Sequence, residues 1–143
     1  MNISQKGINL IASFEGLSLK ACKCLPTEKY YTIGYGHYGA DVKKDMVITK
    51  EKSLELLRKD VKNAVSKVSK YQKKYKFKQN EFDALVSFCY NVGNIRQLTA
   101  NGTRSKSEIA SKMVLYNKSG GKVIRGLTNR RKKEQSVFLK GSY

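Results

Sequence analysis

Acidic residues are scarce in this sequence. Eleven Asp and Glu stand against 29 Lys and Arg, which gives a formal net charge of +18 over 143 residues. Residues 61–78 include seven lysines and no acid, and residues 118–140 include eight basic residues and one acid, Glu134. The electrostatic field of so large a positive charge attracts polyanions. Nucleic acid, anionic lipid and anionic cell-wall polymers all meet this requirement, so charge alone does not choose among them.

Long apolar runs are also missing. No stretch of about 18 apolar residues is present, so no segment is predicted to span a membrane. The N-terminal sequence MNISQKGINLIASFEG has no basic leading region, and Asn9 and Ser13 interrupt its apolar run, so it does not read as a secretory signal. We therefore expect the chain to stay in the cytoplasm in which it is made until it is released by other means.

Histidine, cysteine and proline are few: one, three and one residue, respectively. Cys22 and Cys24 lie too close for a disulfide framework, and one histidine is too few for a spaced four-ligand metal site. Free thiols, no metal and no cofactor are predicted. With no repeat and no linker around Pro26, residues 1–143 are predicted to form one domain.

The hydrophobic pattern predicts a helix-rich α+β domain. Ser4 is expected to cap a helix that ends near Glu15, and Thr49 to begin a second helix. The expected helices are 4–15, 49–68, 79–92, 105–116 and 126–139, with a small sheet over 17–40. In the helix 79–92 an apolar stripe, Phe82, Leu85, Val86, Cys89 and Val92, is expected opposite a polar side, Asp83, Ser87, Tyr90 and Asn91.

Glu15 falls in the middle of the apolar arc of the first helix when residues are placed at about 100° steps. Burial disfavours the charged form of a carboxylate and so favours the protonated form. A general acid must be in this protonated form near neutral pH. The alternative is a helix-end glutamate paired with an arginine.

The segment 32-TIGYGH-37 reads as a strand with Thr32, Gly34 and Gly36 on one face and Ile33, Tyr35 and His37 on the other. A hydroxyl beside two bare positions suggests the wall of a cleft for an extended polymer, although crowding of the backbone against a helix predicts the same glycines. An acid beside a hydroxyl suits hydrolysis of an acetal. Tyr90 offers a ring for a sugar, and Asn91 an amide for hydroxyl or N-acetyl groups.

Glu15-Gly16-Leu17 followed by 32-TIGYGH-37 resembles the motif of the phage-type lysozymes, the endolysin muramidases. The segments 79-QNEFDALVSFCYNVG-93, 116-YNKSGGKV-123 and 126-GLTNRRKKE-134 resemble the later motifs of that family in the same order. The phrase LPTEKYYTIGYGHYG is most similar to endolysins of phages that infect Gram-positive bacteria.

The resemblance implies a lysozyme-like α+β fold. A small sheet-bearing lobe, about 1–60, and a mainly helical lobe, about 61–143, would flank a cleft, with no separate wall-binding domain. The family hydrolyses the β-1,4 bond between N-acetylmuramic acid and N-acetylglucosamine in peptidoglycan. By resemblance Glu15 is the general acid, Thr32 positions water, Arg131 contacts the acid and Cys24 occupies the second catalytic position. The implied substrate contacts are Tyr35, Tyr90, Asn91 and Arg131.

Cys24 departs from the family pattern, in which aspartate is usual. Nearby lysines, Lys20, Lys23 and Lys29, are expected to favour its thiolate, which would orient water or act as a nucleophile. Asp41 and Glu28 are alternative sources of the missing carboxylate. His37 is assigned a structural role, in an ion pair or hydrogen bond with an acid of the second helix.

Glycan strands of peptidoglycan are the implied partner of a monomer, and the positive charge is expected to hold it on anionic wall polymers or a membrane surface. Three other functions fit parts of the sequence. These are a lytic transglycosylase on the same fold, a catalytically impaired peptidoglycan-binding protein, and a basic nucleic-acid-binding protein, which would lack any recognised readout motif.

Overall fold

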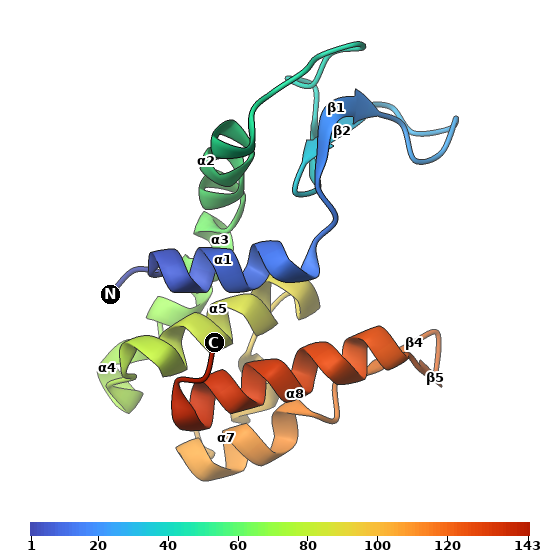
Figure 1. Ribbon diagram of the computed structural model, residues 1–143. Coiled ribbons are helices and arrows are strands. Elements are labelled where there is room, and N and C mark those ends of the chain that lie inside the picture. The colour runs from blue at the N-terminus through green and yellow to red at the C-terminus, as the bar shows by residue number, and fades with distance from the viewer. The chain divides into compact units, whose positions relative to one another are not determined.

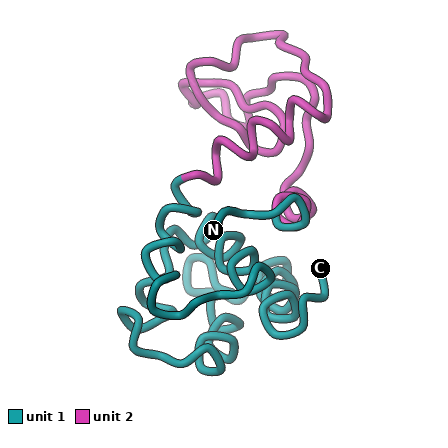
Figure 2. The backbone as a smooth tube through the Cα atoms, turned by 90° about the vertical axis from the view of Figure 1, so that its left-hand side faces the viewer, with its two compact units in different colours: residues 1–7, 63–143 teal, residues 8–62 magenta.

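The computed structural model describes residues 1–143, which form two compact units (Figure 2). The strand unit comprises residues 8–62, and the helical unit comprises residues 1–7 and 63–143. Helix α1 (Gln5–Phe14) begins in the helical unit and ends in the strand unit. Ser4 caps it as predicted, because its Oγ accepts a hydrogen bond from the Gly7 N–H at 3.1 Å.

The strand unit contains a three-stranded antiparallel sheet in the order β1-β2-β3, followed by a helix (Figure 1). Its elements are β1 (Ser18–Cys22), β2 (Tyr31–Gly34), β3 (His37–Gly39) and α2 (Lys50–Asp60). The predicted cap of α2 is confirmed, since the Thr49 hydroxyl accepts from the Lys52 N–H at 3.1 Å. A small core holds the sheet against α2: Ile33, Val42 and Leu56, with Ala21, Tyr31, Met46 and Ile48 around them.

The segment 32–37 is a hairpin and not the single strand that alternation predicted. Strand β2 ends at Gly34 and β3 begins at His37, with Ile33 paired to His37. Gly34 and Gly36 have φ of +66° and +83°, a region that favours glycine, and they turn the chain. A Cβ at Gly34 would lie 3.3 Å from the Ser53 Cβ of α2, so crowding against a helix, the alternative reading, accounts for this glycine. Gly36 has open space around it.

The helical unit is built around α5 (Gln79–Val92), which packs along α8 (Arg125–Lys140) (Figure 1). The remaining helices are α3 (Lys62–Ser69), α4 (Gln72–Tyr75), α6 (Arg96–Thr99) and α7 (Lys106–Met113). A two-stranded hairpin, β4 (Lys118–Ser119) and β5 (Lys122–Val123), precedes α8. Val61 separates α2 from α3 where the sequence predicted one helix over 49–68. No helix is long and apolar enough to cross a membrane.

The predicted polar side of α5 is wrong for Asp83 and Ser87, because residues 81–89 are all buried. Tyr90 is half-buried and Asn91 is exposed, whereas Val92, predicted in the apolar stripe, is exposed at the end of the helix. Asp83, with no exposed surface, accepts from the Ser4 N–H at 3.0 Å, from Gln79 Nε2 at 2.8 Å and from the Tyr143 hydroxyl at 2.5 Å. A short hydrogen bond from the Ser4 hydroxyl completes the cluster. Segments far apart in the chain therefore satisfy a carboxylate that helical spacing assigned to solvent.

The side chains of Asp83 and Ile3 leave no room for a side chain at residue 7. In an exposed helix Gly→Ala stabilises by up to about 1 kcal/mol, but a Cβ at Gly7 would lie 2.6 Å from Ile3 Cγ1 and 2.7 Å from Asp83 Cγ. Asp83 cannot retreat without losing its hydrogen bonds. We expect Gly7→Ala to lower the free energy of unfolding by about 1–3 kcal/mol, measured by urea denaturation.

Gly126→Ala is the matched control, since Gly126 lies in α8, is exposed, and has no atom within 4 Å of an added Cβ. It should raise stability by up to about 1 kcal/mol. Equal effects of the two substitutions would show that residue 7 is not packed as described.

Candidate functional site

Glu15 follows directly after α1. Its N–H donates to the Ala12 carbonyl oxygen at 3.2 Å, which closes the last turn, and its side chain is half-buried. The predicted apolar arc of α1 is confirmed for Ile8 and Ile11, which have no exposed surface. Only two residues, Gly16 and Leu17, separate Glu15 from Ser18, which pairs with Gly34 at the end of the strand that carries Thr32.

Cys24 and Thr32 are brought together by the pairing of β1 with β2. Cys22 lies opposite Thr32 in this pairing, and the chain continues for two residues to Cys24. The Thr32 hydroxyl and the Cys22 side chain are close enough to the Cys24 thiol for both to influence its pKa. Two of the three predicted catalytic residues are therefore in contact within the strand unit, although they are eight positions apart in sequence.

The lysines near Cys24 do not favour its thiolate, contrary to the prediction. The pKa of Cys24 is raised, first by the charge of the neighbouring Cys22, then by burial and by Glu28, while the Thr32 hydroxyl acts in the opposite direction. The ammonium groups point elsewhere: Lys23 lies over the Tyr31 ring and Lys29 over the Tyr30 ring, at 5.1 and 5.3 Å from the ring centroids. Cys24 is therefore a neutral thiol at neutral pH.

The two alternative carboxylates already have partners. Asp41 is bound by His37, and this hydrogen bond holds the pKa of Asp41 below its ordinary value. Glu28 Oε1 accepts from the Leu25 N–H at 2.8 Å and so closes the predicted turn at Pro26. Both carboxylates hold the local backbone or a neighbouring side chain in place.

His37 has the structural role that the sequence predicted. Its Nδ1 lies 2.9 Å from Asp60 Oδ2 at the end of α2, and its Nε2 lies 2.8 Å from Asp41 Oδ2. Burial lowers the pKa of His37, but the hydrogen bonds and charges of the two carboxylates outweigh it, and the net shift is upward. An imidazolium with two N–H donors fits this position and ties β3 to α2.

A cavity of about 430 Å³ in the helical unit collects other predicted residues. Its walls come from the end of α5, the segment before β5 and the first turns of α8: Asn91, Val92, Tyr116, Lys118, Ser119, Leu127 and Arg131. Of the four predicted substrate contacts, Asn91 and Arg131 line this cavity.

Arg131 is only 1% exposed and acts through its neighbours. Its guanidinium donates to Glu134, to the Asn91 amide oxygen and, at 2.8 Å, to the Tyr116 carbonyl oxygen, and it stacks 4.9 Å from the centroid of the Phe88 ring. The bond to Asn91 uses the amide oxygen and leaves the NH₂ group of that exposed side chain as a donor. Arg131 therefore positions a hydrogen-bond donor at the cavity.

Tyr35 is 7% exposed and sits in the turn of the β2–β3 hairpin. It lines another cavity of the strand unit, about 320 Å³, with Asn9, Ala12, Ser13, Lys50 and Leu54, and not the surface that carries Thr32. Tyr90, in α5, is half-buried and is not part of the cavity wall near Asn91.

Residues 116–119 were not predicted to contribute to a site. Gly120 and Gly121 have φ of +58° and +80° and form the tight turn between β4 and β5, which brings Lys118 and Ser119 to the cavity. The signal was present in the sequence, because a Gly-Gly pair between two short extended segments is typical of a hairpin turn. No group of three potential metal ligands occurs in the structure.

Comparison with known proteins agrees with these motifs. The Phage lysozyme family model matches residues 12–134. An endolysin of Bacillus phage B103 is 53% identical over 148 residues, covering 99% of this chain and 55% of the relative. An endolysin of Lactococcus phage c2 is 41% identical over 140 residues, covering 98% of this chain and 61% of the relative. The chain thus spans little more than half the length of these relatives.

Solved structures give the same answer for the fold. The muramidase domain of SpmX from Asticaccaulis excentricus superposes with a TM-score of 0.80 at 35% identity, covering 96% of this chain and 97% of that one. An endolysin from Escherichia coli O157:H7 phage FAHEc1 gives a TM-score of 0.82 at 36% identity, covering 100% and 96%. The predicted lysozyme-like α+β fold is confirmed. Motifs, family match and fold together show that this chain belongs to the phage lysozyme family.

Proposed function

We propose that this chain is a peptidoglycan hydrolase, and specifically an N-acetylmuramidase that cleaves the β-1,4 bond between N-acetylmuramic acid and N-acetylglucosamine. Membership of the phage lysozyme family and the high identity to proteins named endolysins support the general activity. The observation that carries the proposal is the contact of Cys24 with Thr32, in the unit that also bears Glu15 at the end of α1.

In the proposed mechanism Glu15 donates its proton to the glycosidic oxygen as the bond from that oxygen to the sugar carbon breaks. A water held by the Thr32 hydroxyl and the Cys24 thiol attacks the same carbon from the opposite face, and its surplus proton leaves to solvent. The configuration at this carbon is inverted. The half-buried position of Glu15 directly after α1, in the unit that also carries Thr32 and Cys24, supports its role as the acid.

The cavity around Asn91 supplies the proposed sugar contacts. Arg131 holds the oxygen of the Asn91 amide, so the NH₂ group remains to donate to an N-acetyl carbonyl oxygen. Tyr90 is proposed to contact a sugar ring. The chain is proposed to act as a monomer on glycan strands once it has reached the wall, where its net charge of +18 favours contact with anionic polymers.

A lytic transglycosylase is the second candidate, and the neutral thiol of Cys24 favours it. A hydrolase gains from a carboxylate that activates water, and the position that usually supplies one here holds a protonated sulfur. In transglycosylation a hydroxyl of the sugar itself attacks in place of water, so no second carboxylate is needed.

Mass spectrometry of fragments released from purified peptidoglycan separates the two reactions. A hydrolase yields products heavier by one water than the anhydro products of a transglycosylase. We expect the heavier, hydrated fragments from the wild-type chain. Anhydro fragments would assign the second activity, and release of fragments by Cys24→Asp alone would identify the natural chain as a binding protein without turnover.

A further inference from the structure

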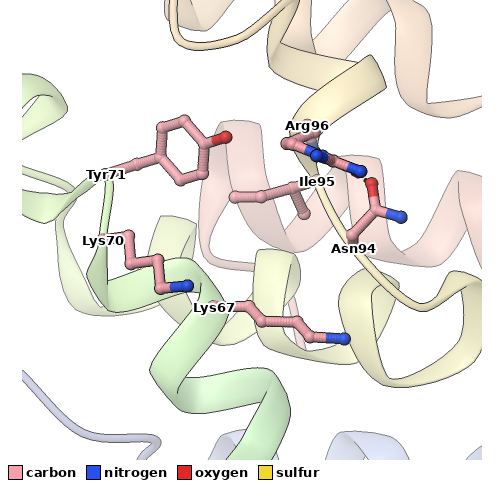
Figure 3. Close-up of a pocket in the computed structure, with 6 residues that line it drawn as sticks. All are labelled: Lys67, Lys70, Tyr71, Asn94, Ile95 and Arg96. Atoms are coloured by element: carbon pink, nitrogen blue, oxygen red, sulfur yellow. Dashed lines mark hydrogen bonds between the residues drawn. The ribbon is translucent and has the colours of Figure 1, made fainter.

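The helical unit contains a second cavity that has no part in the proposed cleavage (Figure 3). Its volume is about 300 Å³, at the lower limit of small-molecule sites. Three of its lining residues lie at or just after the end of α3, and three lie at or just before the start of α6: Lys67, Lys70, Tyr71, Asn94, Ile95 and Arg96. Three of these six side chains are cations, and none is an acid.

The three cations have no carboxylate partners. No ion pair in the structure includes Lys67, Lys70 or Arg96. The Lys67 ammonium donates to the Gly93 carbonyl oxygen at 2.6 Å, which fixes its position and leaves two of its three N–H groups for other acceptors. Like charges gathered without a counter-charge repel one another, so an anion that binds here relieves this repulsion.

The residues that line the cavity come from two sides. Figure 3 shows Lys67, Lys70 and Tyr71 on one wall, at the end of α3 and in the turn after it, with Asn94, Ile95 and Arg96 on the other, in the segment that begins α6. The Asn94 amide oxygen accepts from the Arg96 N–H at 3.0 Å, so its NH₂ group remains as a donor. Ile95, 1% exposed, forms an apolar floor.

We propose that this cavity binds a phosphate group of a linear phosphodiester polymer. Two ammonium groups, a guanidinium and an amide NH₂ surround the cavity with donors, and a phosphate group is an anion that accepts hydrogen bonds from several directions at once. A planar carboxylate would use the Arg96 fork and leave the lysines unsatisfied.

The surroundings favour a polymer with a repeating anion. One wall of the cavity belongs to the segment 61–78, which contains seven lysines and no acidic residue. Other exposed lysines of this segment can meet neighbouring phosphates of the same polymer: Lys62, Lys73, Lys74 and Lys76. A recess of this size admits one repeat of a flexible single chain, whereas a flat array of lipid headgroups or a duplex presents its phosphates on a surface.

Two other polyanion sources are disfavoured by the same residues. Four apolar side chains of the segment, Val61, Ala64, Val68 and Phe77, are buried, and Val65 is half-buried, so no extended apolar face is available to enter a membrane. Tyr71, the single aromatic side chain of the cavity, packs 6.4 Å from Tyr75 and offers no row of rings for stacked bases. Assignment of the polymer to a bacterial wall rests on the proposed function, but the phosphate site itself does not.

Titration with a soluble poly(glycerol phosphate), followed by calorimetry, tests the proposal. Lys70→Gln/Arg96→Gln removes two charges from the cavity, and Lys44→Gln/Arg125→Gln removes two exposed charges elsewhere. We expect the affinity for the polymer to fall about tenfold or more in the first variant and less than about twofold in the second. Addition of inorganic phosphate should shift the amide NMR signals of Asn94, Ile95 and Arg96.

Equal weakening in the two variants would overturn the proposal, because it would show attraction by net charge alone. Phosphatidylglycerol vesicles and a single-stranded oligonucleotide serve as further arms. A stronger dependence on Lys70 and Arg96 in either arm than with the polymer would also refute it. The titrations contain no glycan, so failure of the proposed hydrolysis would leave their outcome unchanged.

Discussion

Glu15→Gln is expected to lower the rate of glycan cleavage by about 10²–10⁴-fold, the range that removal of a general acid produces. Glutamine keeps the size and hydrogen-bonding capacity of the side chain but has no proton of suitable acidity to give the leaving oxygen. The rate is measured by loss of turbidity of purified peptidoglycan and by release of soluble fragments. Urea denaturation of the same preparation separates lost chemistry from lost fold.

Glu55→Gln is the matched control for this substitution. Glu55 lies in α2, its side chain is 56% exposed, and its ion pair with Lys52 spans 3.4 Å at the surface. We expect it to retain the wild-type rate. Cleavage by Glu15→Gln at a rate within about tenfold of wild type would remove Glu15 from the role of general acid.

Glu134→Ala should lower the free energy of unfolding by about 3–5 kcal/mol. Glu134 has no exposed surface and is the counter-charge of two buried arginines, Arg131 at 1% and Arg130 at 6% exposure. Its Oε2 also accepts from the Ser87 hydroxyl at 2.5 Å, which joins α8 to α5. Burial lowers the pKa of the Arg131 guanidinium, and the charge of Glu134 opposes this effect, so loss of Glu134 removes the charge that compensates the buried Arg131.

Urea denaturation measures this loss, and Glu55→Ala again provides the surface comparison, with an expected change within about 1 kcal/mol. A change of less than about 1 kcal/mol for Glu134→Ala would show that water or another group replaces the carboxylate. Replacement of all three charged residues by apolar ones of similar volume should recover much of the lost stability, because the cost arises from charges without partners.

The helices were the most predictable part of the fold, since their signals are local. Ser4 and Thr49 stand directly before apolar-periodic segments, and both cap helices in the structure. The predicted bounds 79–92 match α5. What periodicity could not show is that Asp83 and Ser87 are buried, because their partners, Tyr143 and Glu134, lie 60 and 47 residues away. Buried polar groups are matched by tertiary structure, not by spacing.

The hairpin at 34–36 shows a different limit of prediction. Alternation treats Thr32, Gly34 and Gly36 as one face only while the strand continues, and positive φ at two glycines reverses the chain instead. The same reversal brings His37 back beside Ile33 and within reach of Asp60. The ion pair between His37 and the second helix was predicted correctly, because the chain has one histidine and few acidic residues that could pair with it.

Among the predictions for the site, those that depend on local pairing were more successful than those that depend on where a side chain points. The juxtaposition of Thr32 with Cys24 follows from strand pairing and agrees with their motif positions. The thiolate expected from nearby lysines was wrong, since sequence distance does not say where a long side chain points, and Lys23 and Lys29 lie over tyrosine rings. Arg131 was expected to touch substrate, and it lines the cavity near Asn91 while its buried guanidinium holds the Asn91 amide; this second role was not predicted.

The division of the chain has a consequence for the order in which it folds. Residues 8–62 are contiguous, so the strand unit can complete its contacts while later residues are still being synthesised. The helical unit is discontinuous, and Ser4 meets its partner Asp83 across 79 positions. Because closing so large a loop is slow, we expect the first seven residues to dock late in folding. The start of α1 is then the last segment to form its native contacts.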